Sequence, residues 1–476
     1  MESRKTARAE KPQGKVQRVW DDRGAVYELG EKLAEGGQGH VVTTRADARL
    51  LVKVSKWPNA HPESLEWQRQ IERVHRLPIT ENDLPIAMPK ALIVKPRAGY
   101  VMELMDGLVP LEQLLTQAQQ AFLDGEGLSG YLASGGLRRR LRLLARLARV
   151  MARLHGLGIA HGDLSPKNVF VSESHEHAEV WLIDCDNLTY AVRDSSLQLY
   201  TPDYGAPELL CGERGISTYT DIWSFAVMAF QLLTVLHPFK SGDLVDQDSE
   251  REEPALRGEL PWVDHPEDES NRASLGIPRE LVCTSALRNL FDRCFRLGVL
   301  DAGERPVMAE WAEAFEAAVA VQVLCDTGHD GCGSTFLWNR DLCCPFCDTA
   351  QPAGSVLRLV HSVFAAPVEL GELADPKNCW IMTGHVQTVA SEPVALRAAP
   401  PGTACHAESD SVLSLWVAGD DLTIQVEHGH QVSLQTSGST RLLPLRGRVQ
   451  LPRRGVAHVL HLGTGDRTHD VWRFKW

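Results

Sequence analysis

Residues 161–170, with the sequence HGDLSPKNVF, restrict the possible folds of this chain more than any other segment does. Asp163 and Asn168 stand five positions apart in a polar turn between a helical pattern and a short apolar run. An ionised Asp can orient an attacking hydroxyl and accept its proton, and the neutral amide oxygen of Asn suits a Mg²⁺ ion that keeps part of its water shell. The segment therefore indicates a site for phosphoryl transfer.

Two motifs that precede this segment indicate the same chemistry. In residues 33–41 (LAEGGQGHV), glycines between two predicted strands would let backbone N–H groups approach phosphates. In residues 50–54 (LLVKV), Lys53 enters an apolar setting, and a buried Lys needs an anionic partner. Glu72 on the following predicted helix is the best-placed carboxylate, and Glu66 is the alternative. Such a pair would position the Lys against the phosphates.

Two further motifs follow the segment. The hydrophobic run WLIDCD carries Asp184 to the end of a predicted strand, where its carboxylate can bridge a metal ion and phosphates. The motif TPDYGAPE ends at Glu208, and we expect a buried ion pair with Arg305 to anchor the part of the chain that receives the substrate. Asp221 would brace the backbone of the 161–170 segment from a core helix.

Together the five motifs resemble those of eukaryotic-type protein kinases over about residues 21–320. The resemblance implies a bilobal fold, Mg-ATP between the lobes and a protein hydroxyl as acceptor. It implies these roles: Asp163 is the catalytic base, Asn168 and Asp184 are the Mg²⁺ ligands, and Lys53 with Glu72 is the phosphate-positioning pair.

The same resemblance implies which residues surround the nucleotide. Met102 would lie at the back of the adenine pocket, with Glu103 and Leu104 in the hinge. The full nucleotide set is Ala34, Gly36, Gly37, Gly39, Val41, Lys53, Met102, Glu103, Leu104 and Phe170. Thr201 with Tyr204 matches the Ser/Thr version of the substrate loop. Candidate phosphosites are Ser195, Ser196 and Thr201, of which Thr201 is more plausibly structural.

Several residues depart from the family pattern. Gly162 replaces an Arg that reads activation-loop phosphate, so activity need not depend on that phosphate. Ser165 replaces a Lys, and Leu51 replaces a small residue above adenine. Asp-Cys-Asp replaces Asp-Phe-Gly, which weakens the link to the Glu72 helix and adds Asp186 as a candidate second carboxylate for the metal.

These departures leave two alternatives to a protein kinase. One is a pseudokinase that serves as a nucleotide-binding scaffold, and the other is an atypical small-molecule phosphotransferase. The retained Lys53, Asp163, Asn168 and Asp184 favour an active enzyme. The Ala-Pro-Glu segment and the Asp-x-Trp-Ser motif, which small-molecule phosphotransferases lack, favour a protein kinase.

Cysteines form a separate pattern downstream. Cys325 and Cys332 are followed by Cys344-Pro345-Phe346-Cys347, which indicates a zinc ribbon with structural, four-coordinate Zn²⁺. The upstream spacing is loose, so His329 or Cys343 is an alternative ligand. A kinase followed by a zinc ribbon resembles a bacterial group encoded beside a protein phosphatase and a von Willebrand factor A protein in tellurite-resistance-type clusters. This resemblance makes the co-encoded proteins candidate substrates or regulators.

Composition and charge exclude several classes. Lys and Arg total 49 against 62 Asp and Glu, a net charge of −13, which argues against nucleic-acid or membrane-surface partners. We see no apolar leader or spanning segment and expect a cytoplasmic protein with reduced cysteines. The expected fold is multidomain α+β. Its parts are a flexible tail (1–19), a kinase domain (20–320, N-lobe to about 105 and C-lobe 106–320), a zinc ribbon (321–351) and an all-β sandwich (354–476).

Local patterns predict the elements within these parts. Apolar runs at 26–29, 40–43, 50–54, 91–94 and 100–104 indicate N-lobe strands, interrupted by a helix that Pro62 opens with an apolar face of Leu65, Ile71, Val74 and Leu77. A helix over 137–157 carries a row of Arg that we interpret as a solvated face. Residues 242–278 show little periodicity and are expected to be a surface insertion.

Overall fold

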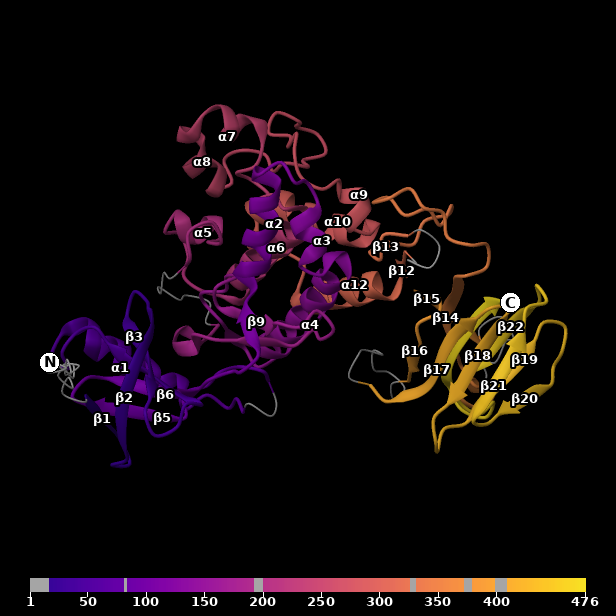
Figure 1. The fold of residues 1–476 in the computed structure, drawn as a ribbon, viewed down its shortest axis with the longest axis horizontal. Helices are drawn as coiled ribbons and strands as arrows, with labels where there is room; N and C mark the ends of the chain where they lie inside the picture. Colours follow the sequence, from indigo (N-terminus) through magenta and orange to yellow (C-terminus); the bar gives the residue numbers. More distant parts are fainter. Residues whose placement is uncertain (1–16, 81–83, 192–199, 326–330, 372–378, 399–408) are drawn as a thin grey trace, which may run out of the picture.

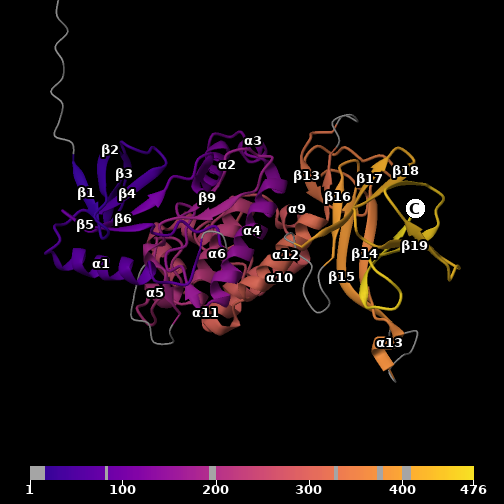
Figure 2. The same ribbon diagram turned by 90° about the horizontal axis from the view of Figure 1, so that it is seen from below.

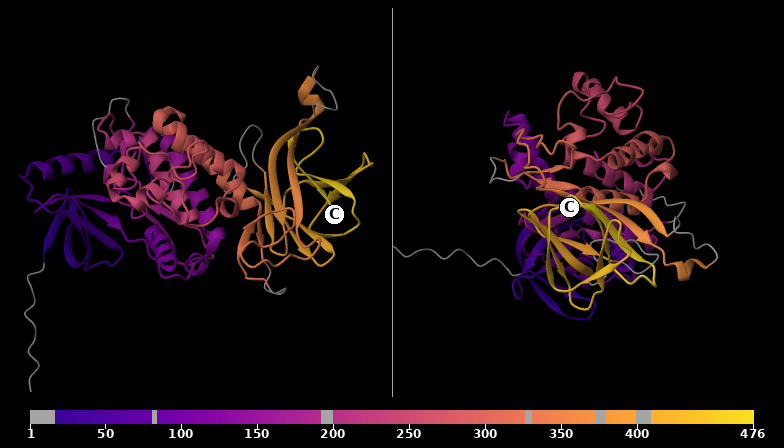
Figure 3. Two further views of the ribbon diagram at one scale, coloured as in Figure 1. Left: turned by 90° about the horizontal axis from the view of Figure 1, so that it is seen from above. Right: turned by 90° about the vertical axis from the view of Figure 1, so that its right-hand side faces the viewer.

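The computed structural model describes residues 17–80, 84–191, 200–325, 331–371, 379–398 and 409–476. A β-rich lobe, a helical lobe and a C-terminal β domain follow one another along the long axis of the molecule (Figure 1). Orthogonal views place the β domain at the far end of the helical lobe from the N-terminal lobe (Figure 2; Figure 3). The expected bilobal domain followed by an all-β domain is confirmed.

The N-terminal lobe is a closed antiparallel barrel with the strand order β1-β2-β3-β4-β6-β5. Its strands are β1 (Arg18–Asp21), β2 (Val26–Glu35), β3 (Gly39–Thr44), β4 (Leu50–Ser55), β5 (Ala91–Lys95) and β6 (Gly99–Glu103). Four of the five predicted runs lie within these strands, and the run at 100–104 extends one residue past the end of β6. The boundary of the tail is wrong, because Arg18 begins β1 and Val19 is buried in the barrel core.

Helix α1 (Pro62–Val74) packs beside the barrel and starts at Pro62 as predicted. Its buried residues are Ser64, Trp67, Ile71 and Val74, whereas Leu65 is exposed. The predicted apolar face was therefore wrong at Leu65. The spacing of three, four and three residues defines the stripe that meets the barrel, and it includes the aromatic side chain of Trp67.

The helical lobe is built around α6 (Thr218–Thr234), which is buried from Thr220 to its end. A capping box of Ser217 and Thr220 starts this helix. The helices around it are α2 (Leu111–Leu123), α3 (Ser129–Ala133), α4 (Gly136–Gly156), α5 (Pro207–Leu210), α9 (Arg279–Val282), α10 (Ser285–Asp292), α11 (Gly298–Leu300) and α12 (Met308–Ala320). Its short strands are β7 (Leu108–Pro110), β8 (Ile159–Ala160), β9 (Val169–Ser172), β10 (Val180–Leu182) and β11 (Thr189–Tyr190).

Two arginines of α4 are not on a solvated face, contrary to our interpretation of the Arg row. Arg139 and Arg140 are buried, and both donate to a backbone carbonyl of a neighbouring element, Arg139 to Ser172 O on β9 and Arg140 to Tyr131 O in α3. The Arg140 guanidinium also stacks over the Tyr131 ring at 3.8 Å. Backbone carbonyls thus compensate the burial of these two charges.

The acidic insertion packs against the helical lobe more closely than expected. It contains α7 (Asp243–Gln247) and α8 (Glu252–Leu256), and its Trp262 and Val263 are buried. Asn271 is fully buried and donates to the carbonyls of Phe239 and Pro261, each at 2.9 Å. The insertion is therefore fastened to the C-lobe core and is not a loose surface loop.

The C-terminal domain is a β-sandwich, as predicted. One sheet has the order β15-β14-β23-β22-β19-β20 and the other β16-β17-β18-β21, and both contribute to one apolar core. The strands are β14 (Leu357–Phe364), β15 (Trp380–Val389), β16 (Val394–Arg397), β17 (Ser411–Ala418), β18 (Asp421–Val426), β19 (Val432–Thr436), β20 (Leu442–Leu445), β21 (Arg448–Pro452), β22 (Ala457–His461) and β23 (His469–Lys475). Short helix α13 (Pro367–Leu370) projects from it (Figure 2).

The sandwich is attached to the helical lobe by polar contacts around the end of α12. Thr388 donates to Gln322 O at 2.7 Å, and Gln387 donates to Ala320 O at 3.0 Å. An ion pair of 2.6 Å joins Arg138 and Glu392. Among the helices of the described ranges, none has the length and the apolar character needed to span a membrane.

Candidate active site and metal centre

The turn between β8 and β9 holds Asp163 and Asn168 together. The Asn168 Nδ2 donates to the Asp163 carbonyl at 2.8 Å and reaches Asp163 Oδ2 at 3.3 Å. Ile183 N donates to Asn168 O at 2.9 Å, which brings the end of β10 against the same turn. Because the amide nitrogen of Asn168 is engaged, its amide oxygen is the atom left to bind a cation.

Asp221 braces this turn as predicted. Its Oδ2 accepts from His161 N at 2.7 Å and its Oδ1 accepts from Gly162 N at 2.9 Å. Gly162 has a φ of +86°, and a Cβ there would lie 3.0 Å from Ile216 Cδ1. A glycine is therefore required where the resemblance expects an Arg, because an L side chain would be strained in this backbone conformation.

A hydroxyl already contacts the predicted catalytic base. Thr201 Oγ1 donates to Asp163 Oδ1 at 2.6 Å. This is the contact that an acceptor alcohol needs in order to lose its proton to a general base. Asp163, which is half-buried, thus has one carboxylate oxygen within hydrogen-bond distance of a hydroxyl, and Thr201 has a structural contact in this state. Ser195 and Ser196 lie outside the described residues.

Lys53 on β4 contacts two carboxylates from the segment after β10. Its Nζ forms ion pairs with Asp184 and, at 3.0 Å, with Asp186 Oδ2, and the side chain is 7% exposed. Asp184 has a φ of +56° at the start of a 3-10 turn (Cys185–Asn187). The structure thus brings Lys53 and Asp184 together and connects them through Ile183 to Asn168 and Asp163.

The predicted ion pair between Lys53 and Glu72 is wrong. Glu72 is half-buried and accepts a hydrogen bond from Gln68 Nε2 at 3.1 Å, one turn away on its own helix. Glu66, the alternative, is exposed. Glu72 follows Ile71 directly, so it points about 100° away from the buried stripe of α1. The carboxylate beside Lys53 comes from Asp186 instead.

The motifs therefore did not predict that Asp186 and Trp67 lie beside Lys53. Trp67 Nε1 donates to Asp186 Oδ2 at 2.7 Å, and the two residues are 4% and 1% exposed. The sequence contained a signal for each of them. Trp67 is the only aromatic residue of the helix, and Asp186 is an acid where the resemblance expects a Gly.

Burial and charge set the protonation of this cluster. Burial lowers the pKa of Lys53, but the two carboxylates outweigh this effect and raise its pKa above the usual value. Burial and the neighbouring Asp186 charge raise the pKa of Asp184 to about 6. Burial favours neutral Asp186, yet Lys53, Asp184 and Trp67 together hold its pKa below the usual value. Asp186 is thus the member of the pair with the lower pKa.

The glycine-rich segment forms the β2–β3 hairpin over this cluster. Gly36 N donates to Gly39 O at 2.9 Å, and Ala34 pairs with Val41 across the hairpin. A Cβ at Gly39 would lie 2.5 Å from Val54 O, so this position excludes any side chain. A Cβ at Gly37 would meet no atom of the described residues within 4 Å, so the backbone there is open to a ligand.

The remaining predicted nucleotide residues lie along β6 and β9. Met102 pairs with Leu51, and Glu103 pairs with Leu50 and forms an ion pair with Lys90. Leu104 N donates to Arg49 O at 2.7 Å, which fixes the chain where it leaves β6. Phe170 lies on β9 directly after the catalytic turn. The residues predicted to surround the nucleotide thus lie on β6, directly after β6 and on β9.

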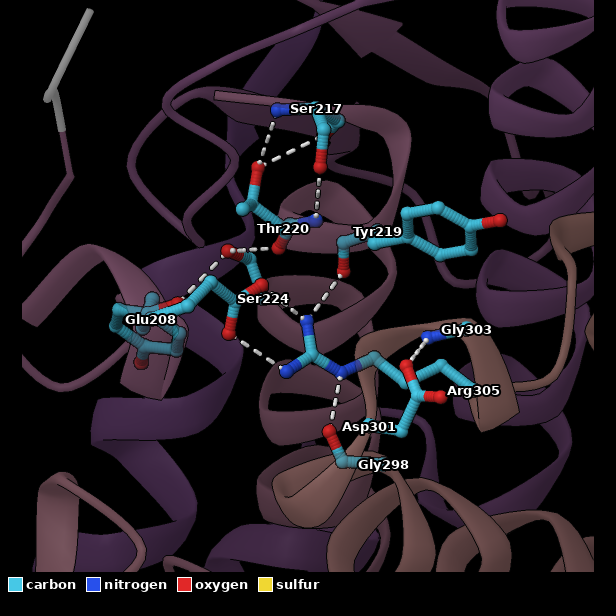
Figure 4. A network of polar contacts seen from close by, with 10 residues as sticks. Glu208, Ser217, Tyr219, Thr220, Ser224, Gly298, Asp301, Gly303 and Arg305 are labelled. Atoms are coloured by element: carbon cyan, nitrogen blue, oxygen red, sulfur yellow. Dashed lines mark hydrogen bonds and ion pairs between the residues drawn. The ribbon is translucent and has the colours of Figure 1, made fainter. Parts of the chain in front are cut away.

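The Glu208–Arg305 pair is confirmed and is central to a polar network (Figure 4). The two guanidinium NH groups bind the two carboxylate oxygens at 2.8 and 2.7 Å, and Arg305 is 2% exposed. Arg305 also donates to the carbonyls of Gly298 and Tyr219, each at 2.9 Å, and lies over the Trp223 ring. The pair joins the segment after Thr201 to helices α6 and α11.

His237 and Lys240 also contact the segment after Thr201, at Asp203. Nδ1 of His237 accepts from the N–H groups of Phe239 and Lys240, both at 3.1 Å, so its Nε2 carries the proton and donates to Asp203 O at 3.0 Å. Lys240 forms an ion pair with Asp203 at 2.8 Å. Protonating His237 would remove the acceptor of two backbone N–H groups.

We predict an acid-sensitive contribution of His237 to stability. Burial lowers the pKa of His237 to about 4, below the value near 6.5 of an unfolded His. The unfolded state therefore takes up the proton first, so this contribution is present above pH 6.5 and is lost between pH 6.5 and 4, by at most about 1.4 kcal/mol per pH unit. In urea unfolding, the stability difference between wild type and His237→Gln should narrow across this range. A difference that stays constant would contradict the assignment.

Four cysteines meet beside strands β12 (Gln322–Leu324) and β13 (Thr335–Leu337). The sulfurs of Cys325, Cys332, Cys344 and Cys347 all lie within 4.8 Å of one another, with 3.6 Å between Cys325 and Cys347 and 3.7 Å between Cys332 and Cys344. Zn–S bonds of about 2.3 Å in a tetrahedron place the sulfurs about 3.8 Å apart. The donor set and its geometry therefore fit Zn²⁺.

The two alternative zinc ligands, Cys343 and His329, are not among these four cysteines. Cys343 Sγ donates to Asp348 O at 3.3 Å and is not part of the group. His329 lies outside the described residues. The four cysteines that the sequence pattern named first are those that converge.

Comparisons with known proteins agree with this geometry. A model of the protein kinase domain matches residues 27–310, more than half of the chain. The serine/threonine-protein kinase pkn2 of Myxococcus xanthus is 30% identical over 207 residues, which cover 41% of this chain and 23% of that protein. The CBL-interacting protein kinase 22 of Oryza sativa subsp. japonica is 26% identical over 247 residues, 46% of this chain and 51% of that protein.

A third relative, ribosomal protein S6 kinase alpha-2 of Mus musculus, is 34% identical over 163 residues, 33% of this chain and 19% of that protein. The chain thus spans about half or less of the length of these curated relatives. The region matched by the kinase-domain model contains the barrel except β1 and the start of β2, together with the catalytic turn and the Glu208–Arg305 pair. This chain belongs to the protein kinase domain family.

Proposed function

We propose that this chain is a Ser/Thr protein kinase that transfers the γ-phosphate of Mg-ATP to protein hydroxyls. The observation that carries the proposal is the contact of Thr201 Oγ1 with Asp163 Oδ1, because it presents a hydroxyl to a carboxylate at 2.6 Å. Asn168 and Asp184 supply the oxygen ligands that Mg²⁺ prefers. The family match and the named Ser/Thr kinases among its relatives support the same activity.

In this proposal each residue has a separate task. Asp163 orients the acceptor hydroxyl and takes its proton, and Asn168 with Asp184 holds the cation. Lys53 neutralises phosphate charge, and the backbone of the β2–β3 hairpin, open at Gly37, covers the phosphates. Bound Mg-ATP supplies the phosphoryl group and the charge neutralisation of the leaving group. The rate gain comes from positioning and electrostatics.

The experiment is incubation of the purified protein with Mg²⁺ and ATP labelled at the γ-phosphate, alone and with candidate proteins. We propose as first candidates a co-encoded protein phosphatase and von Willebrand factor A protein, as in bacterial tellurite-resistance-type clusters. Label on Ser or Thr residues, identified by phosphosite mapping, is the expected result. Nucleotide binding without transfer to any protein would instead favour the pseudokinase alternative, and label only on small molecules would favour the phosphotransferase.

We further propose that Cys325, Cys332, Cys344 and Cys347 hold a structural Zn²⁺. Four thiolates fill the coordination shell of the ion, so no position remains for catalytic water. Purified protein should contain about one zinc ion per chain, and Cys344→Ser should lose it. Cys343→Ser is the matched control, because Cys343 adjoins Cys344 in sequence but its own thiol lies outside the group. Equal zinc content in the two variants, measured by elemental analysis, would contradict this ligand set.

A further inference from the structure

The contacts that hold Lys53 in place do not include a carboxylate of α1. Its Nζ binds Asp186 Oδ2 at 3.0 Å, and the same oxygen accepts the Trp67 indole N–H at 2.7 Å. All three side chains are almost fully buried. A single carboxylate oxygen therefore joins β4 to α1.

The geometry gives Glu66 and Glu72 of α1 no comparable contact with Lys53. Glu72 is bonded to Gln68 and Glu66 is exposed. At the buried position that faces Lys53, α1 instead presents the ring of Trp67, whose centre lies 5.8 Å from the ammonium and 6.2 Å from the Tyr100 ring. An indole N–H is a donor only, so it can bind an anion but can never replace one.

We propose that Asp186 is the positioning residue for Lys53 and that Trp67 couples α1 to it, replacing a helix carboxylate. This inference rests on the proposed kinase function, because it concerns the lysine of the same site. When Asp184 turns to the cation, Lys53 keeps Asp186 as its anionic partner. Trp67 keeps that carboxylate in place only while α1 is docked against the barrel.

The competing view is that Asp186 is a second metal ligand. Its Oδ1 is buried and has no hydrogen-bond partner among the described residues, which is the one feature that favours a cation there. Its Oδ2, however, is already shared by two N–H donors. The two views predict different effects of replacing Asp186. If Asp186 is the partner of Lys53, the substitution alters nucleotide affinity; if it is a metal ligand, the substitution alters the Mg²⁺ requirement.

The test compares Asp186→Asn, Trp67→Phe and Glu72→Gln in the full chain. Loss of a charged hydrogen bond lowers binding by roughly 10- to 100-fold, so Asp186→Asn should reduce kcat/KM for ATP by about that factor at saturating Mg²⁺. Trp67→Phe keeps the ring and removes the N–H, and should raise KM for ATP by roughly 3- to 10-fold. Glu72→Gln should stay within about twofold, since the hydrogen bond that its carboxylate accepts comes from Gln68 on the same helix.

A rescue and a second readout separate positioning from folding and from the proposed activity. In the double variant Trp67→Glu with Asp186→Gly, a carboxylate returns from the helix, and it should recover more activity than Asp186→Gly alone. Amide hydrogen exchange of residues 62–74 should rise in Trp67→Phe and Asp186→Gly but not in Glu72→Gln. This readout remains valid even if the wild type transfers no phosphate, so failure of the kinase proposal is recognised separately.

Two results would overturn the inference. In the first, Glu72→Gln loses as much activity or exchange protection as Asp186→Asn, which would return the role to the helix carboxylate. In the second, Asp186→Asn raises the Mg²⁺ concentration needed for half-maximal rate and leaves KM for ATP unchanged at saturating Mg²⁺. That pattern would identify Asp186 as a metal ligand.

Discussion

Substitution of Asp163 by Asn is expected to lower the rate of phosphate transfer by about 10²- to 10⁴-fold, the usual contribution of a general base. Asn has the same shape but cannot accept a proton from the acceptor hydroxyl. Its Oδ1 can still accept from Thr201, and the bond from Asn168 to the main-chain carbonyl does not involve the side chain. The fold should therefore be retained, and the loss should fall on kcat with little change in KM for ATP.

The measurement is the initial rate of label transfer together with thermal unfolding of each variant. Asp246→Asn is a matched control, because it makes the same chemical change at an exposed position on α7 and should leave rate and melting temperature unchanged. If Asp163→Asn kept the rate of the wild type, Asp163 would not be the base. A contaminating kinase would transfer label at the same rate in preparations of Asp163→Asn and Asp246→Asn. Both variants are therefore purified under one protocol, so that their rates can be compared directly.

The catalytic turn could be predicted because its chemistry is local. Asp163 and Asn168 belong to one short loop, and their mutual contact follows from the path of that loop between β8 and β9. The convergence of Cys325, Cys332, Cys344 and Cys347 was predictable for a similar reason, since all four belong to one short stretch of the chain. The Glu208–Arg305 pair is distant in sequence, so its prediction came from the motif pattern and not from local spacing.

The partner of Lys53 could not be predicted in this way. It depends on which face of α1 meets the barrel, and that face is decided by Trp67, Ile71 and Val74, which no local rule ranks above the neighbouring Leu65. Asp186 reaches Lys53 because Asp184 adopts a left-handed conformation, which the sequence does not reveal. The buried Arg139 shows the same limit, since its partner carbonyl at Ser172 lies on a separate strand.

Breaking the Glu208–Arg305 pair should have the largest effect on stability. Removal of one partner of a buried ion pair costs about 3–5 kcal/mol, because the remaining charge keeps its desolvation cost without compensation. In Arg305→Met, Glu208 loses both of its guanidinium bonds, and the carbonyls of Gly298 and Tyr219 lose their donor. We therefore expect the free energy of unfolding, measured in urea, to fall by an amount in this range.

The control for this prediction is Arg296→Met. Arg296 forms an equally short ion pair, 2.7 Å to Asp292, but both side chains are about one-third exposed, so water can replace the lost contact and the cost should be under about 1 kcal/mol. The double variant Glu208→Gln with Arg305→Met removes the stranded anion and should be more stable than Arg305→Met alone. Equal losses in Arg305→Met and Arg296→Met would show that burial does not strengthen the pair. In that case it would not anchor the segment that follows Thr201.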